Sequence, residues 1–135
     1  MSWIEYAKRV AKEYYDEKTY KHTSRVAHYV SENKFIPSGL MEDCIALAWM
    51  HDLVEDTNFE LNQSCERRIA DCLRLISKPK GESYLNYIKK IKDKSIEFPE
   101  VYWVKLADMK DHLAQTETLT EKLRDKYLAA LPYLL

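Results

Sequence analysis

Residues 40–57, LMEDCIALAWMHDLVEDT, join a helical apolar pattern to a cluster of ionisable side chains. The apolar pattern predicts a helix over Leu40–Glu55, and its buried stripe consists of Ile45, Ala48, Trp49 and Leu53. The C-terminal end of this helix carries four ionisable side chains in one polar corner: His51, Asp52, Glu55 and Asp56. Charged side chains are rarely buried unless something binds them, so this corner is either an acidic surface or a site.

The rest of the chain repeats the helical pattern. Two glycines, four prolines and apolar residues at helical spacing predict an all-α fold. With 135 residues, 46% of them hydrophobic, we expect one compact domain over residues 1–135, built as a bundle of six or seven helices. The expected helices are Trp3–Asp16, Thr19–Asn33, Leu40–Glu55, Glu66–Ser77, Ser83–Lys92, Glu100–Gln115 and Thr120–Leu134.

Charge and cysteine content narrow the class of protein. The net charge of −1 gives no global basic field that would hold nucleic acid or an anionic membrane. We find no basic start followed by an apolar run, and no apolar stretch of the roughly 20 residues that span a bilayer, so we expect a soluble, cytoplasmic protein. Cys44, Cys65 and Cys72 lack a CxxC spacing and are expected to be thiols in a reducing compartment.

The polar corner holds three carboxylates at the negative end of a helix dipole. Their mutual repulsion is unfavourable without a cation, which favours a bound metal ion or another large cation. The alternative is a solvated, acidic helix end that runs into a loop.

Two other segments place ionisable residues on apolar helical faces. His22, in YKHTSRVAHYV, shares a stripe with Val26, where a histidine is more often a core residue with a satisfied hydrogen bond. Asp108, in VKLADMKDHL, has apolar neighbours, and an aspartate there is costly unless it is paired. Lys105, three residues earlier, is the simplest partner for Asp108. Arg25 and His28, three residues apart on the same helix, are either a pair that supports the site or a surface contact, and we favour the surface.

Together these segments resemble the HD-domain metal-dependent phosphohydrolases, and within them the hydrolase domain of RelA/SpoT-type alarmone enzymes. HTSRVA (22–27) is similar to the segment around the family's first histidine, and HDLVEDT (51–57) is similar to its HDxxEDT motif. VKLADMKDHL (104–113) is similar to its VKLAD helix, and KGESYLNYIKKI (80–91) to the substrate-side helix of small stand-alone members. The order and separation of the motifs fit, and the similarity covers essentially the whole chain.

The resemblance implies one divalent metal ion with four protein ligands: His22, His51, Asp52 and Asp108. Two imidazoles and two carboxylates suit Mn²⁺, Fe²⁺ or Zn²⁺ on ligand softness, and the family points to Mn²⁺. Four protein ligands leave positions for water and for a phosphate oxygen of the substrate. Glu55 and Asp56 would orient or deprotonate the attacking water and protonate the leaving group.

The resemblance also implies contacts to the substrate. Lys105 would supply positive charge to the phosphoryl oxygens. Lys78 and Lys80 would grip a phosphate, and Tyr84 or Tyr87 on the next helix would stack on a base. Exposed lysines after a helix are equally compatible with a purely solubilising role.

Three positions depart from the family's pattern. Thr23 stands where the family usually has a proline after the first histidine. His112 stands where it has an asparagine, four residues after Asp108, and would hydrogen-bond the substrate, hold Asp108 or add a metal ligand. Glu13 stands where the family has the arginine that packs on guanine.

We therefore expect a metal-dependent nucleotide phosphohydrolase with a small nucleotide substrate and with neither a nucleic acid nor a membrane as partner. The resemblance favours guanosine 3′,5′-bis(diphosphate), with release of the 3′-pyrophosphate. The alternatives are a phosphatase for another nucleotide or dinucleotide such as NADPH, a nucleotide sensor without turnover, and an α-helical interaction module without a site. The presence of both Glu55 and Asp56 favours an enzyme over a sensor. The oligomeric state stays open.

Overall fold

The computed structural model describes residues 3–61 and 66–135, and these residues form an all-α bundle, which confirms the predicted fold class. The described residues contain no strand. The long helices are α1 (Trp3–Tyr14), α2 (Glu17–Glu32), α3 (Met41–Met50), α5 (Arg67–Ile76), α6 (Tyr84–Asp93), α7 (Pro99–Ala114) and α8 (Glu121–Leu134). Two short elements flank α3, namely the 3₁₀ turn η1 (Ser38–Leu40) and the single turn α4 (Leu53–Asp56). None of the described helices combines the length and the apolar content needed to cross a membrane.

Side-chain caps fix the starts of several helices near the predicted residues. Asp16 accepts a hydrogen bond of 2.8 Å from the backbone N–H of Thr19 and so caps α2. Ser83 and Thr120 cap α6 and α8 in the same way. Pro99 opens α7, where its missing N–H leaves no hydrogen bond unmade. The three caps and Pro99 thus mark where α2, α6, α7 and α8 begin.

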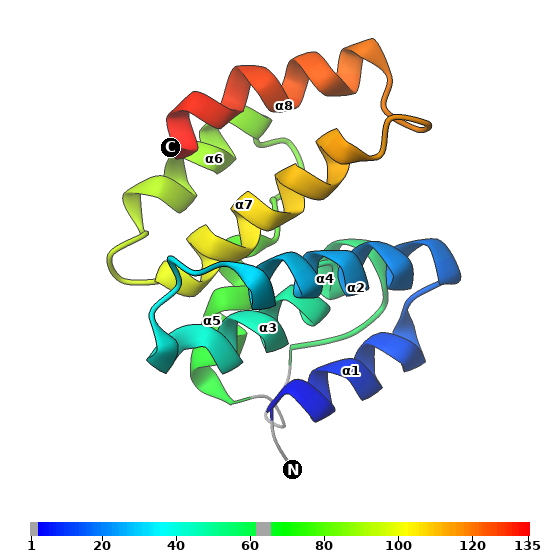
Figure 1. The fold of residues 1–135 in the computed structure, drawn as a ribbon, viewed down its shortest axis with the longest axis vertical. Coiled ribbons are helices and arrows are strands. Elements are labelled where there is room, and N and C mark those ends of the chain that lie inside the picture. Colours follow the sequence, from blue (N-terminus) through cyan, green and yellow to red (C-terminus); the bar gives the residue numbers. More distant parts are fainter. Residues whose placement is uncertain (1–2, 62–65) are drawn as a thin grey trace.

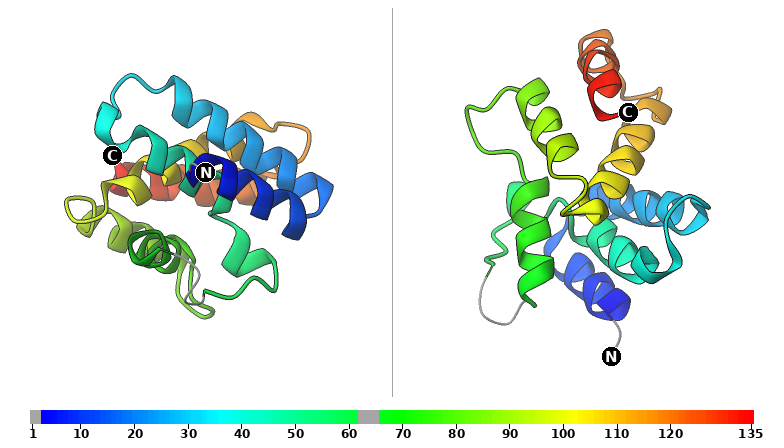
Figure 2. Two further views of the ribbon diagram at one scale, coloured as in Figure 1. Left: turned by 90° about the horizontal axis from the view of Figure 1, so that it is seen from below. Right: turned by 90° about the vertical axis from the view of Figure 1, so that its left-hand side faces the viewer.

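Helix α3 lies at the centre of the bundle. It packs against α1, α2, α5 and α7, and most of its residues are buried. Helix α7 runs between the α1–α3 part of the bundle and the pair formed by α6 and α8 (Figure 1). The side view in Figure 2 shows that α6 and α8 lie on the far side of α7 from α1. One helix, α7, therefore presents residues to both parts of the bundle.

The prediction of one continuous helix over Leu40–Glu55 is wrong. Helix α3 ends at Met50, and His51 and Asp52 form a turn before α4 begins. Asp52 has φ −96° and ψ 0°, and the ring of His51 donates a hydrogen bond to the carbonyl of Ala48. This bond satisfies one of the carbonyls that the end of a helix leaves free. Apolar spacing continues across the turn, so the sequence pattern does not reveal the break.

Two of the three cysteines are buried thiols, as expected. Cys44 and Cys72 both lie in the core, and burial raises the pKa of each thiol to about 12. Thiols with such a pKa hold their proton at neutral pH and are poor nucleophiles. Cys65 lies outside the described residues.

Candidate metal centre

Three predicted metal ligands meet where α2, α7 and the turn after α3 come together. His22 lies on α2, His51 in the turn, and Asp108 on α7, and all three are buried. Oδ1 of Asp108 is 2.9 Å from Nε2 of His22 and 3.1 Å from Nε2 of His51. One ligand atom from each residue lies within 4.8 Å of the other two, so the three form a group that can hold a metal ion.

The second ring nitrogen of each histidine fixes which nitrogen faces the site. Nδ1 of His22 lies 2.7 Å from a carboxylate oxygen of Asp111, and Nδ1 of His51 lies 2.6 Å from the carbonyl oxygen of Ala48. Carbonyl and ionised carboxylate oxygens only accept, so both Nδ1 atoms carry the proton. In a neutral ring, Nε2 then presents a lone pair. Both lone pairs face Oδ1 of Asp108, an arrangement that requires a cation, either a proton on Nε2 or a metal ion.

The fourth predicted ligand, Asp52, lies beside this group without belonging to it. Its Oδ2 is 3.5 Å from Nε2 of His22, and its Oδ1 is 3.4 Å from Nε2 of His51. Adjacent ligands of an octahedral ion with bonds of about 2.1 Å are about 3 Å apart. A small approach of the Asp52 carboxylate would therefore complete a set of two nitrogens and two oxygens. Its backbone N–H donates to the hydroxyl of Tyr15, which holds the turn in place.

Without a metal ion, protons compensate the charge of the cluster. Burial acts to lower the pKa of His51, but the charge of Asp52 and the hydrogen bond to Asp108 outweigh it and raise the pKa to about 9. The pKa of His22 is also raised. Burial acts to lower it, but the hydrogen bond to Asp108 and the charge of that carboxylate outweigh the effect of burial. The opposite balance holds for Asp108, since the charge of Lys105 and hydrogen bonds from the imidazoles overcome its burial and hold its pKa well below the usual range. The cluster therefore binds positive charge strongly.

Lys105 is the partner of Asp108 that the sequence suggested, but it occupies only one oxygen. Its buried ammonium donates to Oδ2 of Asp108 over 2.8 Å. The other oxygen, Oδ1, faces the imidazoles. The ion pair and the histidine cluster therefore coexist on one carboxylate. The ion pair supplies positive charge at the edge of the site.

Asp111 is a site residue that the sequence analysis missed. Its side chain is fully buried and bridges His22 to Arg25, whose guanidinium donates to both carboxylate oxygens over 2.8 and 3.0 Å. The Arg25 side chain is 38% exposed and so lies at the surface, as favoured, but its guanidinium also binds the buried Asp111 and thereby supports His22. The sequence spacing could have indicated this role, because Asp111 follows Asp108 by three residues and therefore lies on the same face of α7.

A pocket of about 180 Å³ opens next to the cluster and gathers most of the predicted site residues. Its lining consists of Asp52, Glu55, Asp56, Lys78, Tyr84, Tyr87, Lys105, Asp108, His112, Lys126 and Tyr127. The proposed catalytic pair, Glu55 and Asp56, thus lies beside two of the predicted metal ligands. Both remain accessible to solvent.

The pKa values of Glu55 and Asp56 are both raised. For Glu55, loss of hydration raises the pKa, Lys105 acts against this, and the charge of Asp52 adds to it. For Asp56, loss of hydration and the charge of Asp52 raise the pKa together. Carboxyl groups shifted in this direction are better able to exchange protons near neutral pH.

His112 is held rigidly at the edge of the site. Its Nε2 lies 3.2 Å from Oδ1 of Asp108, the atom that His22 and His51 also face. Its ring stacks on Tyr127 with centroids 5.0 Å apart and an interplanar angle of 9°, and it packs against His22 on the other side. The contact with Asp108 supports the role of holding that carboxylate, and because His112 also lines the pocket, its role as a substrate contact stays a prediction.

The predicted phosphate contacts are only partly in the pocket. Tyr84 and Lys105 line it, whereas Lys80 is exposed and does not. Lys78 lines the pocket instead, and its ammonium donates to the carbonyl of Glu82 over 2.9 Å. Lys126 and Tyr127 of α8 complete the lining. No sequence pattern singled out these two residues, because the packing of α8 against α6 brings them to the site.

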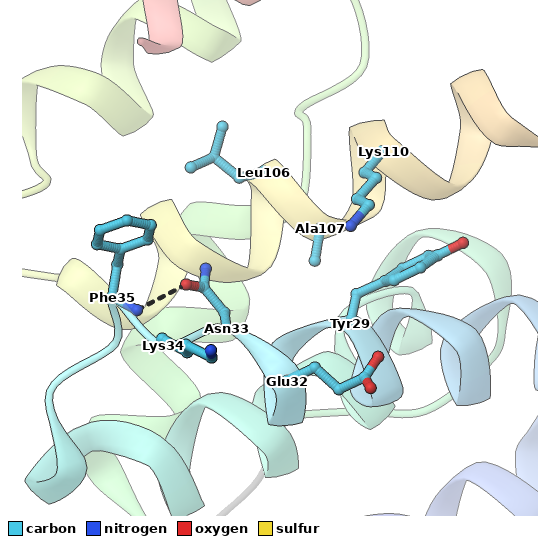
Figure 3. A pocket seen from close by; sticks show the side chains of 8 residues that line it. All are labelled: Tyr29, Glu32, Asn33, Lys34, Phe35, Leu106, Ala107 and Lys110. Carbon is cyan, nitrogen blue, oxygen red and sulfur yellow. Dashed lines mark hydrogen bonds between the residues drawn. The ribbon is translucent and has the colours of Figure 1, made fainter.

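A larger pocket lies on a different face of α7 and contains none of the predicted site residues (Figure 3). It measures about 370 Å³ and is lined by Tyr29, Glu32, Asn33, Lys34, Phe35, Leu106, Ala107 and Lys110. Its one carboxylate comes from Glu32, and it holds no imidazole. We therefore place the candidate site in the smaller pocket, which is lined by the carboxylates, the lysines and His112.

Glu13, one of the three positions at which the sequence departs from the resemblance, lines a third pocket of about 370 Å³. This pocket lies between α1 and the segment after α4, with Arg9, Tyr14 and Phe59 among its lining residues. The rings of Tyr14 and Phe59 meet edge to face there. Glu13 is thus not part of the cluster of His22, His51 and Asp108.

Comparisons with known proteins do not identify a family for this chain. No family model matches the chain, and no curated protein is significantly similar to it. The arrangement of His22, His51 and Asp108 beside Glu55 and Asp56 is therefore the observation from which a function is argued.

Proposed function

We propose that this protein is a metal-dependent phosphohydrolase that acts on a nucleotide. The proposal rests chiefly on one observation: His22, His51 and Asp108 converge from separate parts of the chain. Asp108 also lines a pocket that holds three further carboxylates, those of Asp52, Glu55 and Asp56, and three lysines. A buried structural histidine needs hydrogen-bond partners, but it does not need an adjoining pocket of this composition.

The donor set fits a divalent metal ion. The two Nε2 atoms and the carboxylate oxygens of Asp108 and Asp52 are the ligands in this proposal. Mixed imidazole and carboxylate ligands suit Mn²⁺, Fe²⁺ or Zn²⁺, and we propose Mn²⁺ on the resemblance of the motifs. When bound, such an ion polarises a phosphoryl oxygen and lowers the pKa of water.

Glu55 and Asp56 carry the proton transfers in this account. One of them accepts a proton from the attacking water, and the other donates a proton to the leaving oxygen. Their raised pKa values support both roles, because a carboxyl group with a raised pKa is a stronger base and is also protonated more often near neutral pH. Lys105, fixed on Asp108, adds positive charge where phosphoryl oxygens become more negative.

The substrate that we propose first is guanosine 3′,5′-bis(diphosphate), with release of pyrophosphate. HDLVEDT and VKLADMKDHL support it through their resemblance to alarmone hydrolases. The pocket of about 180 Å³ is smaller than the roughly 300 Å³ or more of pockets that enclose a drug-sized ligand. It therefore suits the phosphate end of a nucleotide better than the base. A different nucleotide or dinucleotide, such as NADPH, satisfies the same chemistry.

The proposal is tested by phosphate and pyrophosphate release from a panel of substrates. Protein loaded with Mn²⁺ is incubated with guanosine 3′,5′-bis(diphosphate), NADPH and common nucleoside phosphates, and both products are quantified. Pyrophosphate from the alarmone alone supports the specific substrate, whereas release from another compound supports the reaction and changes the substrate. Metal binding without any release contradicts the enzymatic proposal and favours a nucleotide sensor.

A further inference from the structure

The loop between α2 and η1 holds a phenylalanine out of the protein. Phe35 is 84% exposed, whereas the next residue, Ile36, is buried in the core. The side chain of Asn33 accepts a hydrogen bond of 2.9 Å from the backbone N–H of Phe35, and the backbone N–H of Ile36 donates to the carbonyl of Asn33. The loop is thus anchored on both sides of Phe35, so little of its backbone has to be ordered when a partner binds.

Phe35 stands at one end of the larger pocket on α7, which measures about 370 Å³. Figure 3 shows Leu106 and Ala107 of α7 in the middle of this pocket, and Tyr29 and Lys110 at the other end. The ammonium of Lys110 lies 4.6 Å from the ring centre of Tyr29. A pocket of this size has room for an aromatic ring, since whole drug-sized ligands occupy pockets of about 300–1,000 Å³.

The protruding ring and the pocket together form a patch that is complementary to itself. An exposed phenylalanine alone is common at protein surfaces and needs no explanation. Here, however, the ring of Phe35 and a pocket lined by apolar side chains lie side by side on one face. A two-fold axis between two copies of the chain would place the ring of each copy in the pocket of the other. Such an isologous contact uses one patch twice and therefore requires a self-complementary surface.

The charged residues around the pocket are complementary under the same two-fold axis. Lys34 accompanies Phe35 at one end, and in the view of Figure 3 the carboxylate of Glu32 points toward the other end, where Tyr29 lies. The axis would therefore bring Lys34 of each copy to Glu32 of the other. Lys34 has no acidic partner in the described part of the chain. Glu32 is paired with His28, but these side chains are 66% and 67% exposed, so the pair holds Glu32 weakly.

We propose that this face binds a second copy of the chain, with the ring of Phe35 inserted into the pocket of the other copy and packed against Leu106. The inference does not depend on the proposed function, because none of the residues that line this pocket belongs to the candidate metal centre. The patch is small compared with the roughly 20–30 residues that each partner contributes to a standard interface. We therefore expect a weak dimer, with a dissociation constant on the order of 10–100 µM.

Sedimentation velocity tests the proposal on the unaltered protein. Over about 5–500 µM the protein should show a reversible equilibrium between monomer and dimer. Phe35→Ser should weaken dimerisation at least about tenfold, and it should leave the melting temperature of dilute protein unchanged because the side chain that it removes is exposed. Leu128→Ser is the matched control, since Leu128 is an exposed apolar residue of α8 outside the pocket. The inference is overturned if the unaltered protein stays monomeric, or if Phe35→Ser dimerises as Leu128→Ser does.

Exchange of charges tests the two-fold arrangement. Glu32→Lys places like charges opposite each other twice in the dimer and should weaken it at least about tenfold. Glu32→Lys combined with Lys34→Glu restores opposite charges and should return the dissociation constant to within about threefold of the unaltered protein. If the double substitution dimerises as weakly as Glu32→Lys alone, Lys34 and Glu32 do not meet across a two-fold axis, and the inference is overturned.

Amide NMR signals locate the contact on the protein. When the concentration of metal-free protein is raised, the signals of four pocket residues should shift, namely those of Tyr29, Leu106, Ala107 and Lys110. The same signals should stay in place in Phe35→Ser. Dimerisation that shifts signals elsewhere but leaves these four unchanged overturns the inference, because the pocket would then not be the interface.

Discussion

Asp111 and His22 lie 89 residues apart in the chain, yet a buried contact of 2.7 Å joins the Asp111 carboxylate to Nδ1 of the His22 ring. Arg25 binds both oxygens of the same carboxylate and thereby fixes its orientation. The ring of His22 cannot turn without breaking this bond, so its Nε2 remains directed at Asp108. A carboxylate in this position also increases the basicity of the imidazole and so its strength as a metal ligand.

Asp111→Asn should lower the affinity for Mn²⁺ about 10- to 100-fold. The amide has one acceptor oxygen, for which His22 and Arg25 must compete, and it carries no charge. Calorimetric titration of Mn²⁺ measures the effect, with the exposed Asp125→Asn on α8 as control. If Asp111→Asn lowers the melting temperature of the metal-free protein but leaves the Mn²⁺ affinity unchanged, Asp111 is only structural.

Asp108→Ala should abolish metal binding and also destabilise the metal-free fold. The substitution leaves the buried ammonium of Lys105 without its counter-charge, which typically costs about 3–5 kcal/mol. Denaturant unfolding measures this loss. The double substitution Asp108→Ala with Lys105→Met should recover part of the stability but none of the metal binding. Unchanged metal content and an unchanged melting temperature in Asp108→Ala would contradict the assignment.

The stability of the metal-free protein should fall as the pH rises from about 6.5 to 9. The pKa of His51 is about 9 in the folded protein and about 6.5 in the unfolded chain, so the folded state binds the proton more tightly. The resulting stabilisation, on the order of 3 kcal/mol, is fully present below pH 6.5 and is lost as the pH passes 9. Denaturant unfolding at several pH values measures it, and His51→Gln should remove most of this dependence. A flat profile for the unaltered protein would refute the charge balance described for the cluster.

Glu55→Gln combined with Asp56→Asn should keep the metal and lose turnover. The amides cannot accept or donate the protons of the reaction, and positioned acid–base groups typically contribute about 10²- to 10⁴-fold to the rate. Metal content and product release are measured on the same sample. Glu42→Gln combined with Asp43→Asn, an adjacent acidic pair outside the pocket, is the control. Turnover that survives the first double substitution rules out the proposed roles of Glu55 and Asp56.

Local patterns predicted the helices well because the helices depend on local features. Cap residues such as Asp16 and Ser83, and Pro99 at the start of α7, mark helix starts in the sequence. The turn at His51 and Asp52 escaped detection since the apolar spacing continues across it. The turn nevertheless matters, because it places His51 against Asp108 and Asp52 beside the rings of His22 and His51.

The candidate site was only partly predictable from the sequence. Motif resemblance singled out His22, His51 and Asp108, which the structure brings together although 86 residues separate the first from the last. The bridge through Asp111 and the contribution of Lys126 depend on how helices pack, and no spacing within one helix encodes that. Residues that act across helices are therefore the ones that the sequence analysis missed.

The metal centre is tested most directly by the stoichiometry of Mn²⁺ binding, measured by calorimetry on the unaltered protein and on His51→Gln. We expect one saturable Mn²⁺ site per chain, accompanied by a rise in melting temperature, because metal that binds only the folded state stabilises it. We expect His51→Gln to lose both effects. Absence of saturable binding, or equal binding by the two proteins, would contradict the claim that His22, His51 and Asp108 form a metal centre.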